Sequence, residues 1–141
     1  MHFHRDLVVV ADLFPPHILK PSSDDVFCGT PPIAFTFGLG ALVLFPFRVG
    51  ASTLLVDKPG PDPILTAIER DRGTILFTAP TMFRALTDLV DQRDLGSLAK
   101  CVSAGETLPA VTYEAWRQKT GIRIIDGLGS TRRFEARLSG N

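Results

Sequence analysis

Three short segments of the chain combine small residues with side chains that suit a bound ligand. They are residues 30–40 (TPPIAFTFGLG), 103–109 (SAGETLP) and 126–131 (DGLGST). Small residues let the backbone approach a ligand closely, and each segment follows a short apolar run typical of a β-strand. One such segment alone is weak evidence for a binding site, because a glycine after a strand is commonly there only to allow a turn. Three of them together favour a binding site.

The elements that must position these segments alternate along the chain. Short apolar runs rich in β-branched residues predict strands, and apolar residues three and four apart predict helices. Pro80 suits the start of a helix, and Gly121 suits a helix C-terminus. The expected strands are 25–30, 52–57, 74–78, 100–104 and 122–126; the expected helices are 38–47, 61–72, 80–90 and 108–120, and a loop is expected over 15–25.

The alternation of strands and helices, with short connections, predicts the fold class. We expect an α/β fold in three layers, with a mostly parallel sheet and flanking helices. In such sheets ligands bind at the carboxyl ends of the strands, in the loops that follow them. The three small-residue segments all follow strands and are therefore expected at that one edge.

Composition restricts the classes of function. The 141 residues are 45% hydrophobic and 21% charged, which fits one globular domain with a real core. The 15 basic and 15 acidic residues cancel, so nucleic acid is not expected as a partner. The apolar run 39–47 is too short to cross a membrane, and the N-terminus has no signal-peptide pattern, so we expect a cytoplasmic protein. Cys28 and Cys101 are expected to be buried thiols, with neither a disulfide nor a zinc site.

The three segments, in this order and spacing, resemble the adenylate-forming acyl-CoA synthetases. Within that superfamily, the chain resembles most the benzoate- and 2-aminobenzoate-CoA ligases. The residues that carry this resemblance are FTFGLG, SAGETLP and IIDGLGST. The resemblance covers residues 1–131, as a partial AMP-binding domain, and leaves residues 132–141 as a divergent tail. It implies ATP-dependent ligation of an aromatic carboxylic acid to coenzyme A. An acyl-adenylate forms with release of pyrophosphate, and coenzyme A then displaces AMP.

The resemblance gives each segment a role, position by position. Four residues match the segment that lines the carboxylate pocket: Phe35, Thr36, Phe37 and Gly38. Four others match the segment beside the adenine and the acyl group: Ala104, Gly105, Glu106 and Thr107. Three residues match the stretch that contacts adenine, and a hydroxyl matches a catalytic position near the α-phosphate: Asp126, Gly127 and Leu128, then Thr131.

Some of these assignments have structural alternatives. Phe35 and Phe37 can be core aromatics, because a pocket wall is itself half core. Glu106 can be a first-turn acid of the following helix, where the helix dipole favours negative charge. His2 and His4 match histidines near the family's active site, but their expected role is packing at the start of a helix.

The last segment departs from the family pattern directly after Thr131. The family has a glutamate there that helps to hold Mg²⁺, and this chain has Arg132. A guanidinium does not ligate a cation, and it adds positive charge where the metal belongs. The family's cofactors are ATP, Mg²⁺ and coenzyme A, but we assign no metal-binding residue here. The phosphate-binding loop, the ribose-binding aspartate and the mobile domain with its catalytic lysine are also not found, so we expect no catalysis by this chain alone.

Two other functions stay open on the sequence. One is a noncatalytic module that binds a nucleotide or an aromatic acid. The other is a free-standing flavodoxin-like domain, for which the GTPP turn after the first strand is a poor phosphate loop. The all-apolar segment 38–47 and open strand edges also predict that the chain self-associates or aggregates.

Overall fold

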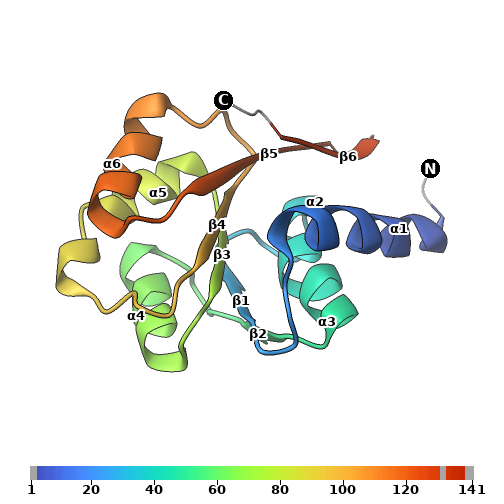
Figure 1. Cartoon of the computed structure of the whole chain (residues 1–141), viewed down its shortest axis with the longest axis horizontal. Coiled ribbons are helices and arrows are strands. Elements are labelled where there is room, and N and C mark those ends of the chain that lie inside the picture. The colour runs from blue at the N-terminus through green and yellow to red at the C-terminus, as the bar shows by residue number, and fades with distance from the viewer. Residues whose placement is uncertain (1–2, 131–132, 139–141) are drawn as a thin grey trace.

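The computed structural model describes residues 3–130 and 133–138 of the chain (Figure 1). The strands are β1 (Val26–Gly29), β2 (Ser52–Leu54), β3 (Ile75–Thr78), β4 (Lys100–Ser103), β5 (Ile124–Ser130) and β6 (Arg133–Leu138). The α-helices are α1 (His4–Phe14), α2 (Thr36–Leu39), α3 (Phe45–Val49), α4 (Pro61–Asp71), α5 (Pro80–Thr87) and α6 (Ala110–Thr120). Two π-helical turns and a 3₁₀ turn complete the elements: η1 (Pro15–Leu19), η2 (Gly40–Leu44) and η3 (Val90–Gln92).

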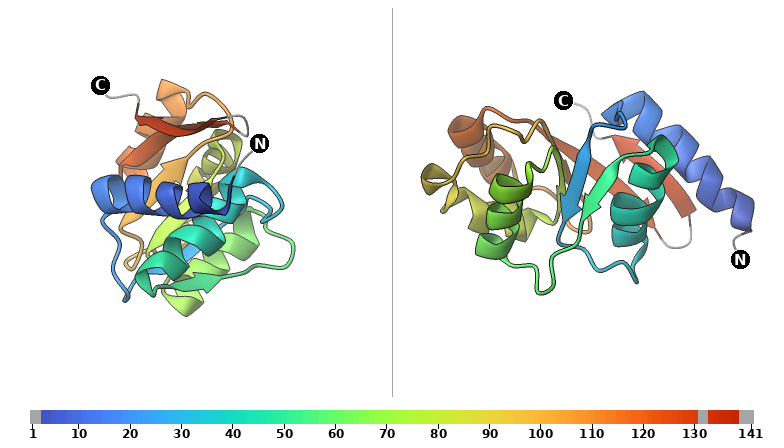
Figure 2. Two further views of the ribbon diagram at one scale, coloured as in Figure 1. Left: turned by 90° about the vertical axis from the view of Figure 1, so that its right-hand side faces the viewer. Right: turned by 90° about the horizontal axis from the view of Figure 1, so that it is seen from below.

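The strands form one sheet in the order β2-β1-β3-β4-β5-β6. The first five in chain order are parallel, and β6 runs antiparallel to β5. Helices α1, α2 and α3 cover one face, and α4, α5 and α6 cover the other (Figures 1 and 2). The expected three-layer α/β fold with a mostly parallel sheet is therefore confirmed. No helix in the described part of the chain combines the length and apolarity needed to cross a membrane.

Side chains of the parallel strands alternate between two buried clusters, because successive residues of a strand point to opposite faces. One cluster lies under α1, η2 and α3 and takes its strand residues from Phe27, Ile75, Phe77 and Val102. The other lies under α4, α5 and α6 and takes them from Cys28, Leu76, Cys101 and Ile124. Burial on both faces explains why these strands read as continuous apolar runs.

The two cysteines are free and buried in the cluster under α4–α6, as expected. Cys28 and Cys101 both pair with Leu76, one from each side, so they lie two strand spacings apart. That separation is about 10 Å, too far for a disulfide without backbone movement. Burial raises the pKa of the Cys28 thiol to about 12 and raises the pKa of Cys101 as well. Both thiols are therefore inert packing groups.

The apolar segment predicted as a helix over 38–47 extends from residue 36 to residue 49 and contains a π-helical turn. Pro46 explains the turn, because it has no amide hydrogen to donate to the carbonyl of Leu42. The amide of Phe45 instead reaches back five residues to the carbonyl of Gly40. The expected loop over 15–25 is wrong at its start. Residues 15–19 continue from α1 as a π-helical turn, closed by the Lys20 amide on the Pro15 carbonyl at 2.7 Å.

The last strand pair differs most from the sequence expectation. The strand expected over 122–126 begins at Ile124 and continues to Ser130, and β6 returns antiparallel beside it. Charged and apolar residues alternate over 133–138 (RFEARL), a pattern typical of a half-buried strand that sequence reasoning did not use. β6 contacts α1, so the first helix and the last strand of the described chain lie side by side (Figure 1).

Asp25 fastens the amino ends of three strands, and its contacts predict a pH dependence of stability. Its carboxylate accepts hydrogen bonds from the Thr74 hydroxyl at 2.7 Å and the Ser22 amide at 2.8 Å, with the Lys100 ammonium at 3.7 Å. Burial alone would raise the pKa of Asp25, but the Ser22, Thr74 and Lys100 contacts outweigh it and lower the pKa below the ordinary value. The charged carboxylate of Asp25 therefore stabilises the fold at pH values above its unfolded-state pKa. This stabilisation is lost as the pH falls through the lower folded-state pKa.

We expect Asp25→Asn to lower the free energy of unfolding by about 1.5 kcal/mol at pH 7, because hydrogen bonds to a charged acceptor are weakened. Urea denaturation followed by circular dichroism across the acid range measures this. The difference from wild type should shrink as the pH falls below about 4, the ordinary value for aspartate. Asp24→Asn, at an exposed neighbouring carboxyl, is the control. A difference that stays constant with pH would contradict the assignment.

Candidate functional site

The three small-residue segments meet at the carboxyl edge of the sheet. The loop after β1 leads into α2, the loop after β4 begins at Ala104, and β5 continues past the edge. Ser103 pairs in register with Asp126, and α2 contacts β5 (Figure 1). At Gly127, an added Cβ would lie 3.4 Å from the Ser103 carbonyl oxygen. The structure thus brings together the segments that the sequence predicts for the acid and for adenine.

Phe35 and Phe37 play different parts at this edge. Phe37 is half-buried, and its ring meets the edge of the buried Phe77 ring with centroids 5.9 Å apart. Phe35 is 65% exposed at the start of α2. Exposure of this size does not fit a core aromatic, whereas Phe37 is both a core contact and a neighbour of the open edge. Thr36, between them, is half-buried.

Gly38 holds α2 against the loop that precedes it. A Cβ at this position would lie 2.1 Å from the Pro32 carbonyl oxygen and 2.7 Å from that of Pro31. These are backbone atoms, so they cannot rotate away as a side chain would. The absence of a side chain at Gly38 therefore sets how closely the Phe35–Phe37 segment approaches the strands.

The segment after β4 is open to solvent beyond its first residue. Ala104 is buried, and Gly105 has a left-handed backbone with φ of 92° and no atom near its missing side chain. Glu106 and Thr107 are exposed, and Glu106 accepts a hydrogen bond of 3.3 Å from the Thr81 hydroxyl of α5. This contact between the loop and the first turn of α5 gave no signal in the sequence.

The helix after this segment begins later than expected. Pro109 has an extended backbone, and α6 starts at Ala110 instead of residue 108. Glu106 therefore lies ahead of the helix, and the first-turn interpretation of its charge is wrong. Glu106 is an exposed residue of the loop between β4 and α6.

β5 supplies the side of the site expected to contact adenine. Asp126 and Gly127 are half-buried at the level of the Ser103–Ala104 backbone. Leu128 is 66% exposed, and nothing lies within 4 Å of the missing side chain of Gly129. An exposed leucine next to the open backbone of Gly129 offers an apolar surface that suits a flat base.

Several sequence predictions cannot be placed on this geometry. Thr131, Arg132 and His2 lie outside the described residues. His4 begins α1, as expected of a residue at a helix start, but its side chain is exposed. Within residues 3–130 and 133–138, no group of three or more histidine, cysteine, aspartate or glutamate side chains is placed to hold a metal ion.

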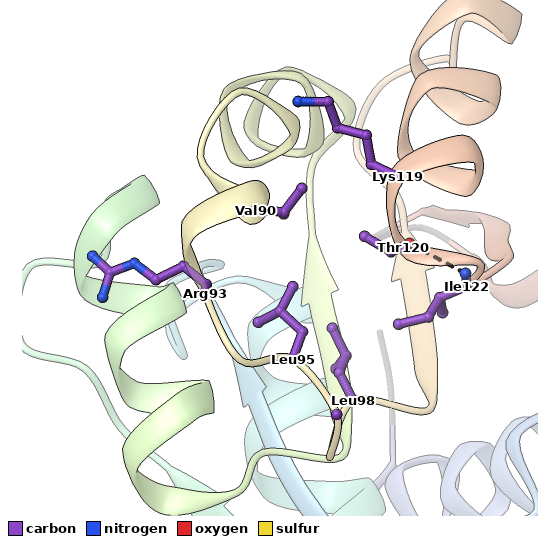
Figure 3. Close-up of a pocket in the computed structure, with 8 residues that line it drawn as sticks. Val90, Arg93, Leu95, Leu98, Lys119, Thr120 and Ile122 are labelled. Atoms are coloured by element: carbon purple, nitrogen blue, oxygen red, sulfur yellow. Dashed lines mark hydrogen bonds between the residues drawn. The ribbon is translucent and has the colours of Figure 1, made fainter.

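A hollow of about 350 Å³ lies at the opposite edge of the sheet, where β4 and β5 begin (Figure 3). Its lining residues are Val90, Arg93, Leu95, Gly96, Leu98, Lys119, Thr120 and Ile122. The charged ends of Arg93 and Lys119 point away from it, and both bind carboxylates: Arg93 those of Asp62 and Glu69, and Lys119 that of Asp91. The hollow is therefore separate from the three loops.

Known proteins are similar to this chain in sequence and in fold. A benzoate–CoA ligase of Thauera aromatica is 32% identical over 142 residues, which cover 99% of this chain and 27% of that protein. An anthranilate–CoA ligase of Pseudomonas aeruginosa is 31% identical over 132 residues, which cover 93% of this chain and 25% of that protein. The crystal structure of the anthranilate CoA ligase AuaEII in complex with anthranoyl-AMP superimposes with a TM-score of 0.87 at 39% identity, over 96% of this chain and 27% of that one.

The family described as AMP-binding enzyme matches residues 1–132, nearly the whole chain. The match includes all three loops of the candidate site. The chain spans 27% and 25% of the length of the two curated relatives above. By this match, the chain belongs to the AMP-binding enzyme family.

Proposed function

We propose that this chain supplies the acid-binding and adenine-binding loops of a ligase that joins an aromatic carboxylic acid to coenzyme A and releases AMP. The observation that carries the proposal is the meeting of residues 35–38, 104–107 and 126–128 at one edge of the sheet. Because the chain spans about a quarter of its relatives' length, the complete reaction is assigned to a longer protein of this kind.

The character of the acid-binding segment supports an aromatic substrate. Residues 30–40 contain two phenylalanines and no charged residue. An exposed ring at Phe35 and a half-buried ring at Phe37 offer flat apolar surfaces for an aryl group. The relatives named above act on benzoate and anthranilate (2-aminobenzoate), and we propose acids of that size.

The cofactors fit this edge to different degrees. Leu128 and the open backbone at Gly105 and Gly129 suit the adenosine of ATP. When bound, ATP would supply the adenylyl group that activates the acid, with pyrophosphate as the leaving group. The described residues offer no matching set of ligands for Mg²⁺, and Arg132 stands where the family pattern has a glutamate. We therefore propose binding without turnover by this chain.

Separate binding measurements test the proposal and its rival. Labelled ATP and 2-aminobenzoate, each titrated into purified chain, report the adenine and acid segments independently. Binding of both with no pyrophosphate release supports a ligase portion that does not turn over alone. Binding of one ligand only would favour the noncatalytic module, and binding of neither would contradict both. Malonate, a non-aromatic acid, is the control ligand.

Phe37 offers a sharper test of the acid segment. We expect Phe37→Ala to weaken 2-aminobenzoate binding by about ten- to a hundred-fold, because one ring face of the pocket is lost. ATP affinity should stay nearly unchanged. Phe47→Ala, at an exposed ring of the same helical segment, is the control and should change neither. Equal weakening of both ligands would show that Phe37 acts only through the core.

A further inference from the structure

Two threonine hydroxyls meet where the acid-binding loop leaves the sheet. Thr30 directly follows β1, and Thr78 is the last residue of β3. Their hydroxyl oxygens are 2.5 Å apart and share a hydrogen bond, and the Thr30 amide donates to the Phe77 carbonyl at 3.1 Å. Thr78 is fully buried and Thr30 is half-buried. Thr30 begins the predicted segment 30–40 but has no role assigned to it there, and Thr78 lies outside all three segments.

The pair occupies the point where the chain changes direction across the sheet. From β1 the chain runs outward to β2, and β3 lies on the other side of β1. Open α/β sheets bind ligands at such a switch point, since the loops on its two sides diverge there. Any contact between the ends of β1 and β3 therefore sets the separation of those loops.

The end of β3 holds the acid-binding loop from both faces of the sheet. Phe77 points to the face of α2, where its ring meets Phe37. Thr78 is the next residue and points to the opposite face, where its hydroxyl meets Thr30. The loop is thus fixed at its first residue by one side chain and at Phe37 by the other.

Close backbone contacts connect the Thr30–Thr78 hydrogen bond to the acid-binding residues. Pro31 and Pro32 follow Thr30, and their carbonyl oxygens lie against Gly38 with no room for a Cβ. The Phe35 amide donates to the Pro32 carbonyl at 3.0 Å. Two prolines have fixed φ angles, so a shift at Thr30 passes along this stretch instead of being absorbed in it.

We propose that Thr30 and Thr78 are positioning residues that hold residues 31–38 in the geometry that receives the aromatic acid. The inference rests on the proposed function for its ligand. Removing either hydroxyl leaves the other without its partner in a largely buried site, which favours displacement of the loop. The threonines do not touch the acid and act through Pro31, Pro32 and Gly38.

The test compares Thr78→Val with Thr78→Ser, since valine keeps the shape and serine keeps the hydroxyl. In Thr78→Val, amide hydrogen exchange over residues 33–39 should become about tenfold faster, the factor expected when a buried hydrogen-bonding group loses its partner. Exchange in α4 should not change. 2-Aminobenzoate should bind about tenfold more weakly, with ATP affinity unchanged, and serine should restore both properties.

Thr87→Val is the matched control. Thr87 is also a buried threonine, on α5, and its hydroxyl donates to the Phe83 carbonyl at 2.7 Å, away from the acid-binding loop. It should lower stability without changing exchange over residues 33–39 or acid affinity. Unchanged exchange in Thr78→Val, or equal effects from Thr87→Val, would overturn the inference. A wild-type chain that binds no acid would contradict the proposed function instead, and the exchange measurement would still decide the anchoring.

Discussion

Gly38→Ala is expected to abolish detectable acid binding and to lower the free energy of unfolding by about 3 kcal/mol, the upper end for overpacking. The new Cβ would lie 2.1 Å from the Pro32 carbonyl oxygen and 2.5 Å from its carbonyl carbon. Backbone atoms on both sides meet there, so either α2 or the Pro31–Pro32 loop must move. Phe35 and Phe37 move with α2, and the pocket geometry is lost.

Urea denaturation and titration with 2-aminobenzoate measure the two effects of Gly38→Ala. Gly60→Ala is the matched control, because a Cβ there would lie 3.7 Å from the Pro63 ring, an ordinary contact. That variant should lose at most about 1 kcal/mol, as expected for alanine in place of glycine at a helix N-cap. Normal acid affinity in Gly38→Ala would show that the position of α2 does not control the pocket.

Trp116→Ala is expected to lower the free energy of unfolding by about 4 kcal/mol, the middle of the range for truncating a buried large aromatic. Trp116 is fully buried on α6 and packs edge-on against the Phe83 ring of α5, with centroids 5.1 Å apart. Removing the indole leaves a cavity between these helices and the sheet. Since Trp116 is the only tryptophan, unfolding is followed by far-ultraviolet circular dichroism.

Val111→Ala on the same helix is the control for Trp116→Ala. Val111 is 77% exposed, and its truncation should change stability by no more than about 0.5 kcal/mol. Trp116→Phe should fall between the two variants, because it keeps a ring at the contact with Phe83. A loss below about 1 kcal/mol for Trp116→Ala would mean that the core between α5 and α6 collapses to fill the space.

The sequence by itself determined the fold class and the edge of the sheet at which the three small-residue segments meet. Strand and helix periods are local properties, so the runs 74–78 and 100–104 identified β3 and β4 within one residue. Glycine at residue 121 marked the end of α6, where φ is 73°. Once the strands are parallel, the loops that follow them must share an edge, and the three small-residue segments therefore meet.

The ends of helices and strands were harder to predict, because neighbouring parts of the same chain determine where each one stops. β5 extends to Ser130 because β6 pairs with it, and that pairing depends on residues that follow the strand. The apolar segment near Pro46 is a helix with a π-helical turn, because Pro46 has no amide hydrogen and the amide of the preceding Phe45 bonds to the carbonyl five residues back. The hydrophobic periodicity of the sequence predicts neither the pairing of β5 with β6 nor the π-helical turn.

Only the tertiary structure decided which side chains of the site face the core and which face the open edge. Phe35 and Phe37 are two residues apart and chemically identical, yet only Phe37 meets Phe77, because α2 is turned that way against β3. Thr30 and Thr78 are 48 residues apart in the sequence. Strand register alone brings their hydroxyls together, and register is set by the packing of both faces of the sheet, which no local pattern encodes.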